Sequence, residues 1–135
     1  MKILVVDDDY VVRKKLSTIM ESVGKCESVE TGEAAVEAFR RAWENWAPFD
    51  LIMLDISMPD MEGTEVLYTI RDMERKKNIP DDKKAKIIMV SGYSDKDTVI
   101  TSIQAGCDDY IKKPFRRDVI LQKIKNCRLG HHIEK

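Results

Sequence analysis

The sequence predicts a single α/β domain in which five strands alternate with five helices. Short, continuous apolar runs at residues 3–6, 51–54 and 87–90 are typical of strands that are buried on both faces. Segments with apolar residues at helical spacing follow these runs. The 135 residues are enough for one domain and too few for two. Strands that alternate with helices in this way form a parallel sheet with helices on both faces, which is a doubly wound fold.

The first strand is expected over residues 3–6, and Asp9 is expected to cap the helix after it. That helix carries its apolar residues on one face: Val12, Leu16, Ile19, Met20 and Val23. Residues 26–30 are expected to form a short second strand. Thr31 can then cap the second helix, because its hydroxyl can accept a hydrogen bond from a free backbone N–H. The second helix is expected to end at Pro48 and to bury Ala35, Phe39, Ala42, Trp43 and Trp46.

The third strand ends at Asp55 and leads into a loop that contains Pro59 and Gly63. A third helix follows, and its apolar face consists of Val66, Leu67, Ile70 and Met73. Most side chains of residues 75–86 are charged, and Pro80 interrupts them. We therefore expect a long surface loop between the third helix and the fourth strand.

The last two strand–helix units are shorter. The fourth strand ends in Ser91, and Ser94 with Asp97 three residues later resembles a capping box at the start of a helix. This short helix carries Val99, Ile100 and Ile103. A fifth strand is expected over residues 108–111, and a final helix with Ile120, Leu121, Ile124 and Cys127 closes the fold.

Acidic and basic residues nearly balance, with 24 Asp and Glu against 23 Lys and Arg. The bases are scattered among the acids, which argues against nucleic acid as a ligand. No apolar run approaches the length of a membrane span, and residues 3–6 are too few for a signal peptide. Three widely spaced cysteines without metal-ligand spacing indicate reduced thiols. We expect a cytoplasmic protein that contacts no membrane and is a monomer or a weak dimer.

Polar side chains stand where the predicted strands end. Asp7 and Asp8 follow the first strand, Asp55 ends the third, Ser91 ends the fourth and Lys113 follows the fifth. The carboxyl ends of parallel strands meet at one edge of the sheet, where open α/β folds bind their ligands. Carboxylates beside an ammonium and a hydroxyl fit a divalent cation and a phosphoryl group.

The chain resembles a response-regulator receiver domain, the phospho-acceptor module of two-component signalling, and in particular the receivers of chemotaxis regulators. The resemblance covers residues 2–128 and rests on five segments in this order: Val5-Val6-Asp7-Asp8, Leu54-Asp55-Ile56-Ser57-Met58-Pro59 with Gly63, Val90-Ser91-Gly92, Ala105-Gly106 and Lys112-Lys113-Pro114-Phe115. It implies a receiver domain over residues 1–128 and a C-terminal tail over residues 129–135. It also implies a flavodoxin-like sheet with the strand order 2-1-3-4-5.

By this resemblance, Asp55 is the residue that a histidine kinase or a histidine phosphotransfer protein phosphorylates. A carboxylate can act as the nucleophile that forms an aspartyl phosphate. The implied cofactor is Mg²⁺, because clustered carboxylates tolerate one another and an incoming phosphate only with a cation between them. In the family pattern, Asp8 and Asp55 bind the ion directly, Asp7 binds it through water and Ser57 binds it through its backbone carbonyl.

The resemblance also assigns roles to residues around the phosphorylation site. Lys113 neutralises the phosphoryl oxygens, and its bond to Pro114 is expected to be cis. Ser91 and Tyr110 form the switch, in which the hydroxyl moves towards the phosphate and the ring turns inward. The surface that changes consists of the fourth helix, the fifth strand and the fifth helix. It is expected to bind a downstream protein that the sequence does not identify.

Two flanking residues, Ser57 and Tyr93, are expected to control how fast the phosphate is lost. The ring of Tyr93, two residues after Ser91, would hinder an in-line water molecule and so prolong the phosphorylated state. We expect a signalling phospho-acceptor rather than an enzyme. Such a domain would catalyse its own phosphotransfer and its own dephosphorylation.

Two other functions fit part of the sequence. Asp7 and Asp9 match the D-x-D-x-V motif of haloacid-dehalogenase-like phosphatases, in which Asp7 would be the nucleophile and Asp9 the acid. That interpretation leaves Asp55 without a role and places the acidic pair at residues 108–109 before Lys113 rather than after it. The second alternative is an inert, receiver-like interaction module, but the sequence lacks none of the side chains that the receiver site needs.

Overall fold

A computed structural model describes residues 1–92 and 96–127 of the chain. The elements in order are β1 (Lys2–Val6), α1 (Tyr10–Glu21), β2 (Lys25–Val29), α2 (Gly32–Glu44), β3 (Leu51–Asp55), α3 (Gly63–Lys76), the 3-10 helix η1 (Asp81–Lys83), β4 (Lys86–Ser91), α4 (Lys96–Gln104), β5 (Asp109–Lys112) and α5 (Arg117–Asn126). All strand pairs are parallel, and the sheet order is β2-β1-β3-β4-β5. The predicted fold class and strand order are confirmed.

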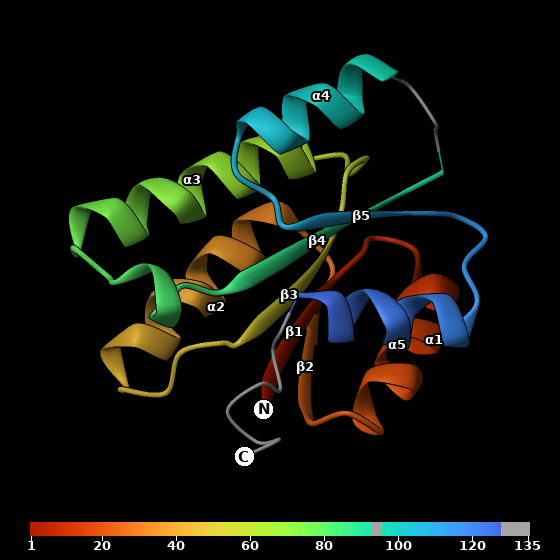
Figure 1. Cartoon of the computed structure of the whole chain (residues 1–135), viewed down its shortest axis with the longest axis horizontal. Coiled ribbons are helices and arrows are strands. Elements are labelled where there is room, and N and C mark those ends of the chain that lie inside the picture. Colours follow the sequence, from red (N-terminus) through yellow and green to blue (C-terminus); the bar gives the residue numbers. More distant parts are fainter. Residues whose placement is uncertain (93–95, 128–135) are drawn as a thin grey trace.

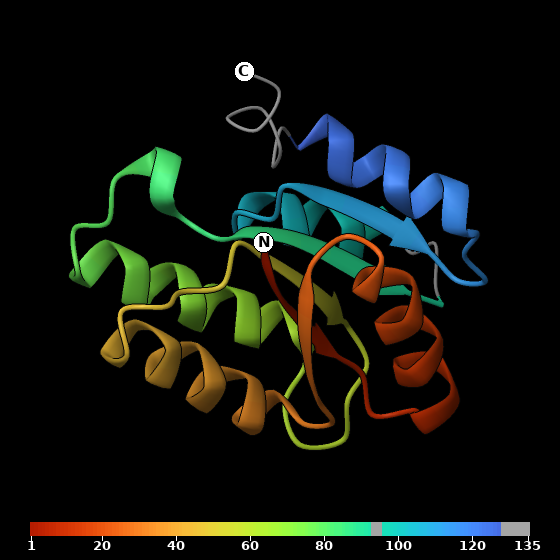
Figure 2. The same ribbon diagram turned by 90° about the horizontal axis from the view of Figure 1, so that it is seen from below.

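The sheet is buried between two layers of helices. Figures 1 and 2 show α1 and α5 on one face of the sheet and α2 and α3 on the other, with α4 beside α3. Alternate residues of β1 enter two separate cores: Leu4 and Val6 pack with α2 and α3, whereas Ile3 and Val5 pack with α1 and α5. All four side chains are fully buried. Because both faces of the strand are covered, its apolar run is continuous rather than alternating.

Two of the three predicted helix caps, Asp9 and Thr31, lie in the described residues, and both are present. Asp9 Oδ1 accepts hydrogen bonds from the backbone N–H groups of Val11 and Val12, at 2.9 and 3.2 Å. Thr31 Oγ1 accepts one from the N–H of Ala34 at 3.0 Å. The first turn of a helix leaves these N–H groups without intrahelical partners, so the caps fix where α1 and α2 begin.

The α2 helix ends earlier than predicted, at Glu44 rather than at Pro48. Trp46 adopts a left-handed φ of 56°, and the N–H of Ala47 donates to the carbonyl of Ala42 at 2.9 Å. The predicted burial of Trp46 was wrong, since 86% of this residue is exposed. The chain reverses direction at Trp46, and this reversal takes its ring away from the buried face of the helix.

Residues 75–86 contain more regular structure than the predicted loop. The α3 helix continues to Lys76, η1 spans Asp81–Lys83 and β4 begins at Lys86. The predicted cap at Ser94, the flanking residue Tyr93 and the tail over residues 129–135 lie outside the described residues. Within residues 1–92 and 96–127, none of the helices combines the length and the apolarity of a membrane span.

Candidate functional site

The strand register brings the predicted site residues to one edge of the sheet. Asp55, the last residue of β3, is paired with Val90 of β4, and Ser91 is paired with Lys112 of β5. Asp7 directly follows β1, which lies beside β3, and Lys113 directly follows β5. Side chains that are up to 106 positions apart in the sequence therefore meet at the carboxyl ends of neighbouring strands.

Three carboxylates form an acidic cluster at this edge. Asp7, Asp8 and Asp55 each place one carboxylate oxygen within 4.8 Å of the others. Asp7 and Asp55 are buried, whereas Asp8 is exposed. Burial, and next the negative charge of Asp7, raise the pKa of Asp55 to about 6. The cluster therefore concentrates negative charge that the protein alone does not neutralise.

Lys113 supplies the positive charge that the described residues place against this cluster. Its Nζ lies 3.0 Å from Asp7 Oδ2 and 3.2 Å from Asp55 Oδ1. Burial by itself would lower the pKa of Lys113, but the neighbouring carboxylates Asp7 and Asp55 outweigh this effect and raise the pKa above its usual value. The ammonium is thus held in its charged form between two of the three carboxylates.

The donor set fits a divalent cation. Asp7 Oδ1 accepts a hydrogen bond from the N–H of Asp9 at 2.9 Å. Asp7 Oδ2 is buried, and the partner that the described residues give it is the ammonium of Lys113 at 3.0 Å. Three carboxylates against one ammonium leave excess negative charge, and hard oxygen ligands of this kind suit Mg²⁺.

The loop between β3 and α3 passes beside the cluster. Its first residue, Ile56, is buried and donates its N–H to the carbonyl of Val90 at 3.2 Å. Ser57 follows and is exposed, whereas Met58 is buried. The backbone of Ser57 is therefore two residues from Asp55 and next to a residue anchored on the sheet.

The predicted switch residues lie on β4 and β5. Ser91 is 1% exposed, and its carbonyl accepts a hydrogen bond from the N–H of Lys113 at 2.7 Å. Tyr110 is half-buried and packs against the core that contains α2 and α3. The peptide bond between Lys113 and Pro114 is cis. Ser91 and Lys113 thus lie at the same edge of the sheet and are linked there by a hydrogen bond between their backbones.

Two residues that hold the site had not been singled out in the sequence. Arg13 of α1 donates from Nη1 to the backbone carbonyl of Asp7 at 2.9 Å. Asp60, in the loop after β3, accepts hydrogen bonds from the first turn of α2. In the sequence, Arg13 belongs to the polar face of a helix and Asp60 to a turn, so no motif or periodicity marks either of them.

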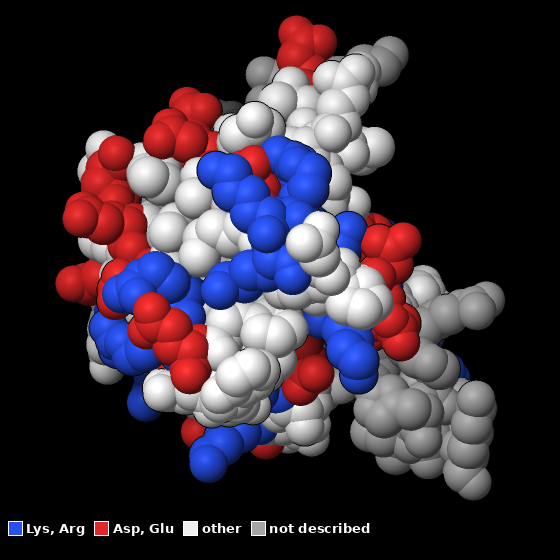
Figure 3. Space-filling view, turned by 90° about the vertical axis from the view of Figure 1, so that its left-hand side faces the viewer, with Lys and Arg blue, Asp and Glu red and all other residues white. Residues whose placement is uncertain are grey.

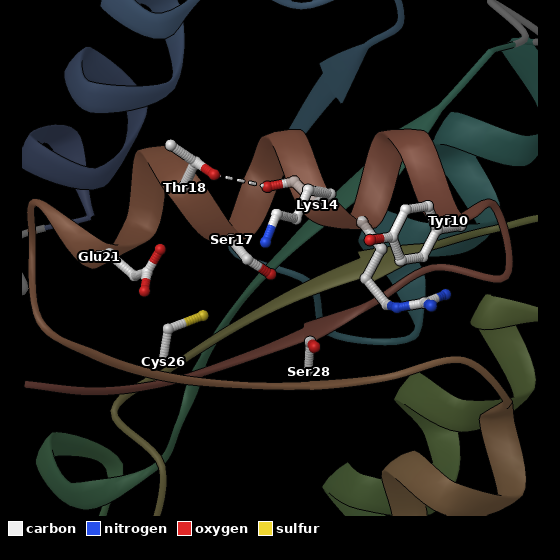
Figure 4. Close-up of a pocket in the computed structure, with 8 residues that line it drawn as sticks. Tyr10, Lys14, Ser17, Thr18, Glu21, Cys26 and Ser28 are labelled. Carbon is white, nitrogen blue, oxygen red and sulfur yellow. Dashed lines mark hydrogen bonds between the residues drawn. The ribbon is translucent and has the colours of Figure 1, made fainter.

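Apart from the acidic cluster, a hollow with a volume of 330 Å³ lies between α1 and β2 (Figure 4). It is lined by Tyr10, Arg13, Lys14, Ser17, Thr18, Glu21, Cys26 and Ser28. The hydroxyl of Thr18 donates to the carbonyl of Lys14 at 2.9 Å, which is a contact within α1. Burial raises the pKa of the Cys26 thiol, so this group is not activated as a nucleophile. Phosphoryl chemistry is therefore expected at the acidic cluster and not in this hollow.

The geometry of the site agrees with the family to which the chain belongs. The family model of the response regulator receiver domain matches residues 3–125. The chain is thus a member of the response-regulator receiver family, as its motifs predicted.

Known relatives include both small receiver proteins and larger proteins. Over 125 residues, the chain is 35% identical to the chemotaxis protein CheY of Bacillus subtilis, with 91% of this chain and 93% of CheY covered. It is also 35% identical to part of the hybrid signal transduction histidine kinase L of Dictyostelium discoideum, over 97% of this chain but 8% of the kinase. It spans 48% of the cell cycle transcriptional regulator CtrA of Caulobacter vibrioides. Several relatives are therefore much longer than the matched region.

Solved structures show the same fold. A CheY-like receiver domain protein from Methanospirillum hungatei has a TM-score of 0.81 at 30% identity, covering 98% of this chain and 96% of that chain. A chain of the CheX-CheY-BeF3-Mg²⁺ complex from Borrelia burgdorferi has a TM-score of 0.78 at 29% identity, with 93% of this chain and 87% of that chain covered.

Membership of the family defines the class of function. Receiver domains are signalling phospho-acceptors and not classical enzymes, and the phospho-acceptor role fits the acidic cluster. They bind Mg²⁺ at an acidic site and interact with histidine kinases and with downstream targets. The phosphatase and the inert-module alternatives are not favoured.

Proposed function

We propose that Asp55 accepts a phosphoryl group from a phosphohistidine of a histidine kinase or histidine phosphotransfer protein. The observation that carries this proposal is that Asp55 Oδ1 lies 3.2 Å from Lys113 Nζ within the cluster of Asp7, Asp8 and Asp55. A carboxylate oxygen of Asp55 attacks phosphorus, and the bond from phosphorus to the histidine nitrogen breaks. The imidazole leaves with the electron pair of that bond, and Lys113 balances the charge on the phosphoryl oxygens.

The proposed cofactor is Mg²⁺, with Asp8 and Asp55 as direct ligands, Asp7 as a ligand through water and the backbone carbonyl of Ser57 as a further ligand. The excess of the three carboxylates Asp7, Asp8 and Asp55 over the single ammonium of Lys113 supports this assignment. When bound, the ion neutralises charge on the carboxylates and on the phosphoryl group. The related complex from Borrelia burgdorferi contains both BeF3 and Mg²⁺.

Phosphorylation is proposed to change the surface formed by α4, β5 and α5. The phosphate adds strong acceptor oxygens beside Lys113 and near Ser91, and contacts that exist only in the phosphorylated state shift a conformational equilibrium. Ser91 and Tyr110 are the proposed switch residues, and the partner of the switched surface is an unknown downstream protein. Self-catalysed loss of the phosphate returns the domain to rest, at a rate that Ser57 and Tyr93 tune.

We propose that the chain binds no nucleic acid. Figure 3 shows the face at the C-terminal ends of α2 and α3, where Lys and Arg are interspersed with Asp and Glu. Several bases of α2, of α3 and of the segment after η1 form ion pairs with neighbouring acids, among them Arg40 with Glu37, Lys76 with Asp72 and Lys84 with Asp81. Paired charges of this kind are a poor match for a phosphate backbone.

The remaining proposals concern the protein in the cell. We place the domain in the cytoplasm as a monomer or weak dimer. The support for the compartment is the free state of Cys26, Cys107 and Cys127, since an oxidising compartment favours disulfides.

The deciding experiment incubates the purified protein with a small acyl phosphate and Mg²⁺ and measures its intact mass and the site of modification. We expect one added phosphoryl group on Asp55, no uptake by Asp55→Asn and little uptake without the metal. Phosphorylation of Asp7 instead would support the phosphatase alternative. No uptake by the folded protein under any of these conditions would support the inert module.

A further inference from the structure

The loop between β3 and α3, residues 56–62, is closed at its base. The N–H of Gly63 donates to the carbonyl of Ile56 at 2.7 Å. A Cβ atom at Gly63 would lie 2.2 Å from the carbonyl oxygen of Asp55, so only glycine allows this approach of the loop to the strand. The two ends of the loop are therefore held together directly beside Asp55.

The tip of the same loop is tied to the start of α2 by Asp60. Asp60 Oδ1 accepts a hydrogen bond from the N–H of Gly32 at 3.1 Å, and Oδ2 accepts one from the N–H of Glu33 at 3.0 Å. The backbone N–H groups of Glu33 and then Gly32 lower the pKa of Asp60. The positive end of the α2 dipole favours a carboxylate at this position. Both oxygens of one side chain thus bridge two elements that are 28 positions apart in the sequence.

The contact between the loop and α2 is also sterically tight. A Cβ atom at Gly32 would come within 2.8 Å of Val66 Cγ2 and 2.9 Å of Met61 Cβ. Met61 belongs to the loop and Val66 to α3, so both press against the first residue of α2. The loop therefore has little freedom to shift relative to α2 while the Asp60 hydrogen bonds are in place.

We propose that Asp60 is a positioning residue for the metal site, because it fixes the loop segment that carries Ser57. This inference rests on the proposed function, in which the carbonyl of Ser57 is a Mg²⁺ ligand. Ser57 lies in this loop between two fixed points. One is the base of the loop, which the hydrogen bond from Gly63 to Ile56 closes, and the other is the tip, which Asp60 ties to α2. The Asp60 carboxylate is engaged with α2 and acts on the metal through the loop, as the outer partners of metal ligands do.

The coupling must work in both directions. If the Asp60 bridge improves Mg²⁺ binding, then Mg²⁺ binding stabilises the bridge by the same factor, by thermodynamic linkage. The N–H groups of Gly32 and Glu33 report on the bridge, because they exchange with solvent only when its hydrogen bonds open. Mg²⁺ is therefore expected to slow hydrogen exchange at two amides that do not touch the metal.

The test compares three variants of the full chain: Asp60→Ala, Asp60→Asn and Thr31→Ala. Thr31→Ala is the matched control, because it removes a different cap of the same helix, the hydrogen bond from the N–H of Ala34, and leaves the loop attached. Calorimetry measures the Mg²⁺ affinity of the unphosphorylated proteins, NMR measures amide exchange with and without Mg²⁺, and thermal unfolding records the loss of stability in each variant.

Asp60→Ala is expected to weaken Mg²⁺ binding by about tenfold and to abolish the effect of Mg²⁺ on the Glu33 amide. Asp60→Asn should have a smaller effect, because its amide oxygen is still an acceptor. The Mg²⁺ affinity of Thr31→Ala should stay within about twofold of that of the wild type, even if this variant loses as much thermal stability as Asp60→Ala.

The inference is overturned if Asp60→Ala binds Mg²⁺ like the wild type, or if Thr31→Ala weakens binding equally, since helix stability would then explain the effect. If Asp60→Ala does not fold, Asp60→Asn is judged by the same criteria. A wild-type protein that binds Mg²⁺ and accepts a phosphoryl group on Asp55 leaves the proposed function standing in either case. If the wild-type protein neither binds Mg²⁺ nor accepts a phosphoryl group, both the proposed function and the role of Asp60 are refuted.

Discussion

Lys113 Nζ lies 3.2 Å from Asp55 Oδ1, so the proposed phosphoryl acceptor already has a positive charge beside it before any substrate arrives. The Lys113 side chain is 22% exposed and that of Asp55 is 4% exposed. Water therefore screens this pair only in part. A charge that is fixed in advance stabilises a developing negative charge without the cost of reorganisation during transfer.

Removing this ammonium should slow phosphorylation. Lys113→Ala is expected to lower the rate of uptake from a small acyl phosphate by about 100-fold, which is typical for the loss of one preorganised group at a reacting centre. The rate is measured by intact mass over time at saturating Mg²⁺. Lys112→Ala is the matched control, because Lys112 is the exposed neighbour on β5. Equal rates in the two variants would contradict the role of Lys113.

The raised pKa of Asp55 makes stability depend on pH in the metal-free protein. Burial and the neighbouring Asp7 raise the pKa of Asp55 from 3.8 to about 6. The folded state then holds this proton more tightly than the unfolded state. The resulting stability is complete below the unfolded pKa and is lost as the pH rises through the folded pKa.

The variant Asp55→Asn has no carboxyl group at this position, so it does not lose this stability as the pH rises. The variant is expected to be more stable than the wild type at pH 8 by at most about 3 kcal/mol, and the difference should shrink towards pH 4. Urea unfolding in the presence of a chelator at both pH values measures it. A variant that is no more stable than the wild type at pH 8 would show that Asp55 ionises in the fold without cost.

Magnesium should stabilise the folded domain, because the unfolded chain has no preformed cluster. At ten times its dissociation constant, a ligand that binds only the native state adds about 1.4 kcal/mol to the free energy of unfolding. Asp8→Asn is expected to lose most of this gain, and because Asp8 is exposed the substitution should not disturb the core. Thermal unfolding with MgCl₂ is compared with NaCl at equal ionic strength. An identical shift with both salts would point to screening rather than binding.

The sequence predicts the fold well because its strongest signals are physical necessities of a buried parallel sheet. Residues 51–54 form a continuous apolar run because both faces of β3 are covered, and Asp55 follows them because the strand ends at the open edge. The meeting of Asp7, Asp55 and Lys113 at one edge of the sheet could be predicted for the same reason, since parallel strands end together. Trp46 could not be placed, because a left-handed residue just after the end of α2 takes its side chain out of the helical register, and no periodicity in the sequence marks that residue.

Side-chain networks between distant elements were the other feature that the sequence did not reveal. Arg71 of α3 donates to the carbonyls of Ala85 and Gly106 and to the carboxylates of Glu74 and Asp108. In the sequence, Arg71 and Glu74 look like any other oppositely charged pair three positions apart on a helix. Their other partners come from the segments just before β4 and β5, which lie far from α3 in the sequence. Periodicity describes one element at a time and carries no such information.

The buried carboxylate of this network should be essential for stability. Glu74 is fully buried and accepts hydrogen bonds from Arg71 Nη1 at 2.7 Å and from the N–H of Ala85 at 2.8 Å. Glu74→Ala leaves both donors without this acceptor and is expected to cost about 3–5 kcal/mol in the free energy of unfolding. Asp72→Ala, which removes exposed pairs from the same helix, should change little. Urea unfolding of both variants measures the change in the free energy of unfolding. Equal losses of stability in the two variants would mean that the burial of Glu74 and its partners does not matter.

Replacing the exposed Trp46 should stabilise the protein. A bulky residue with a φ of 56° is strained because its Cβ approaches the following carbonyl, whereas glycine adopts this conformation freely. The residue is 86% exposed, so its removal forfeits little packing. Trp46→Gly is expected to raise the free energy of unfolding by about 0.5–1 kcal/mol. Asn78, which has the same φ of 56°, provides the control, because asparagine tolerates this region and Asn78→Gly should gain less. A loss of stability in Trp46→Gly would show that the exposed ring contributes more through contact with the surface than its backbone strain costs.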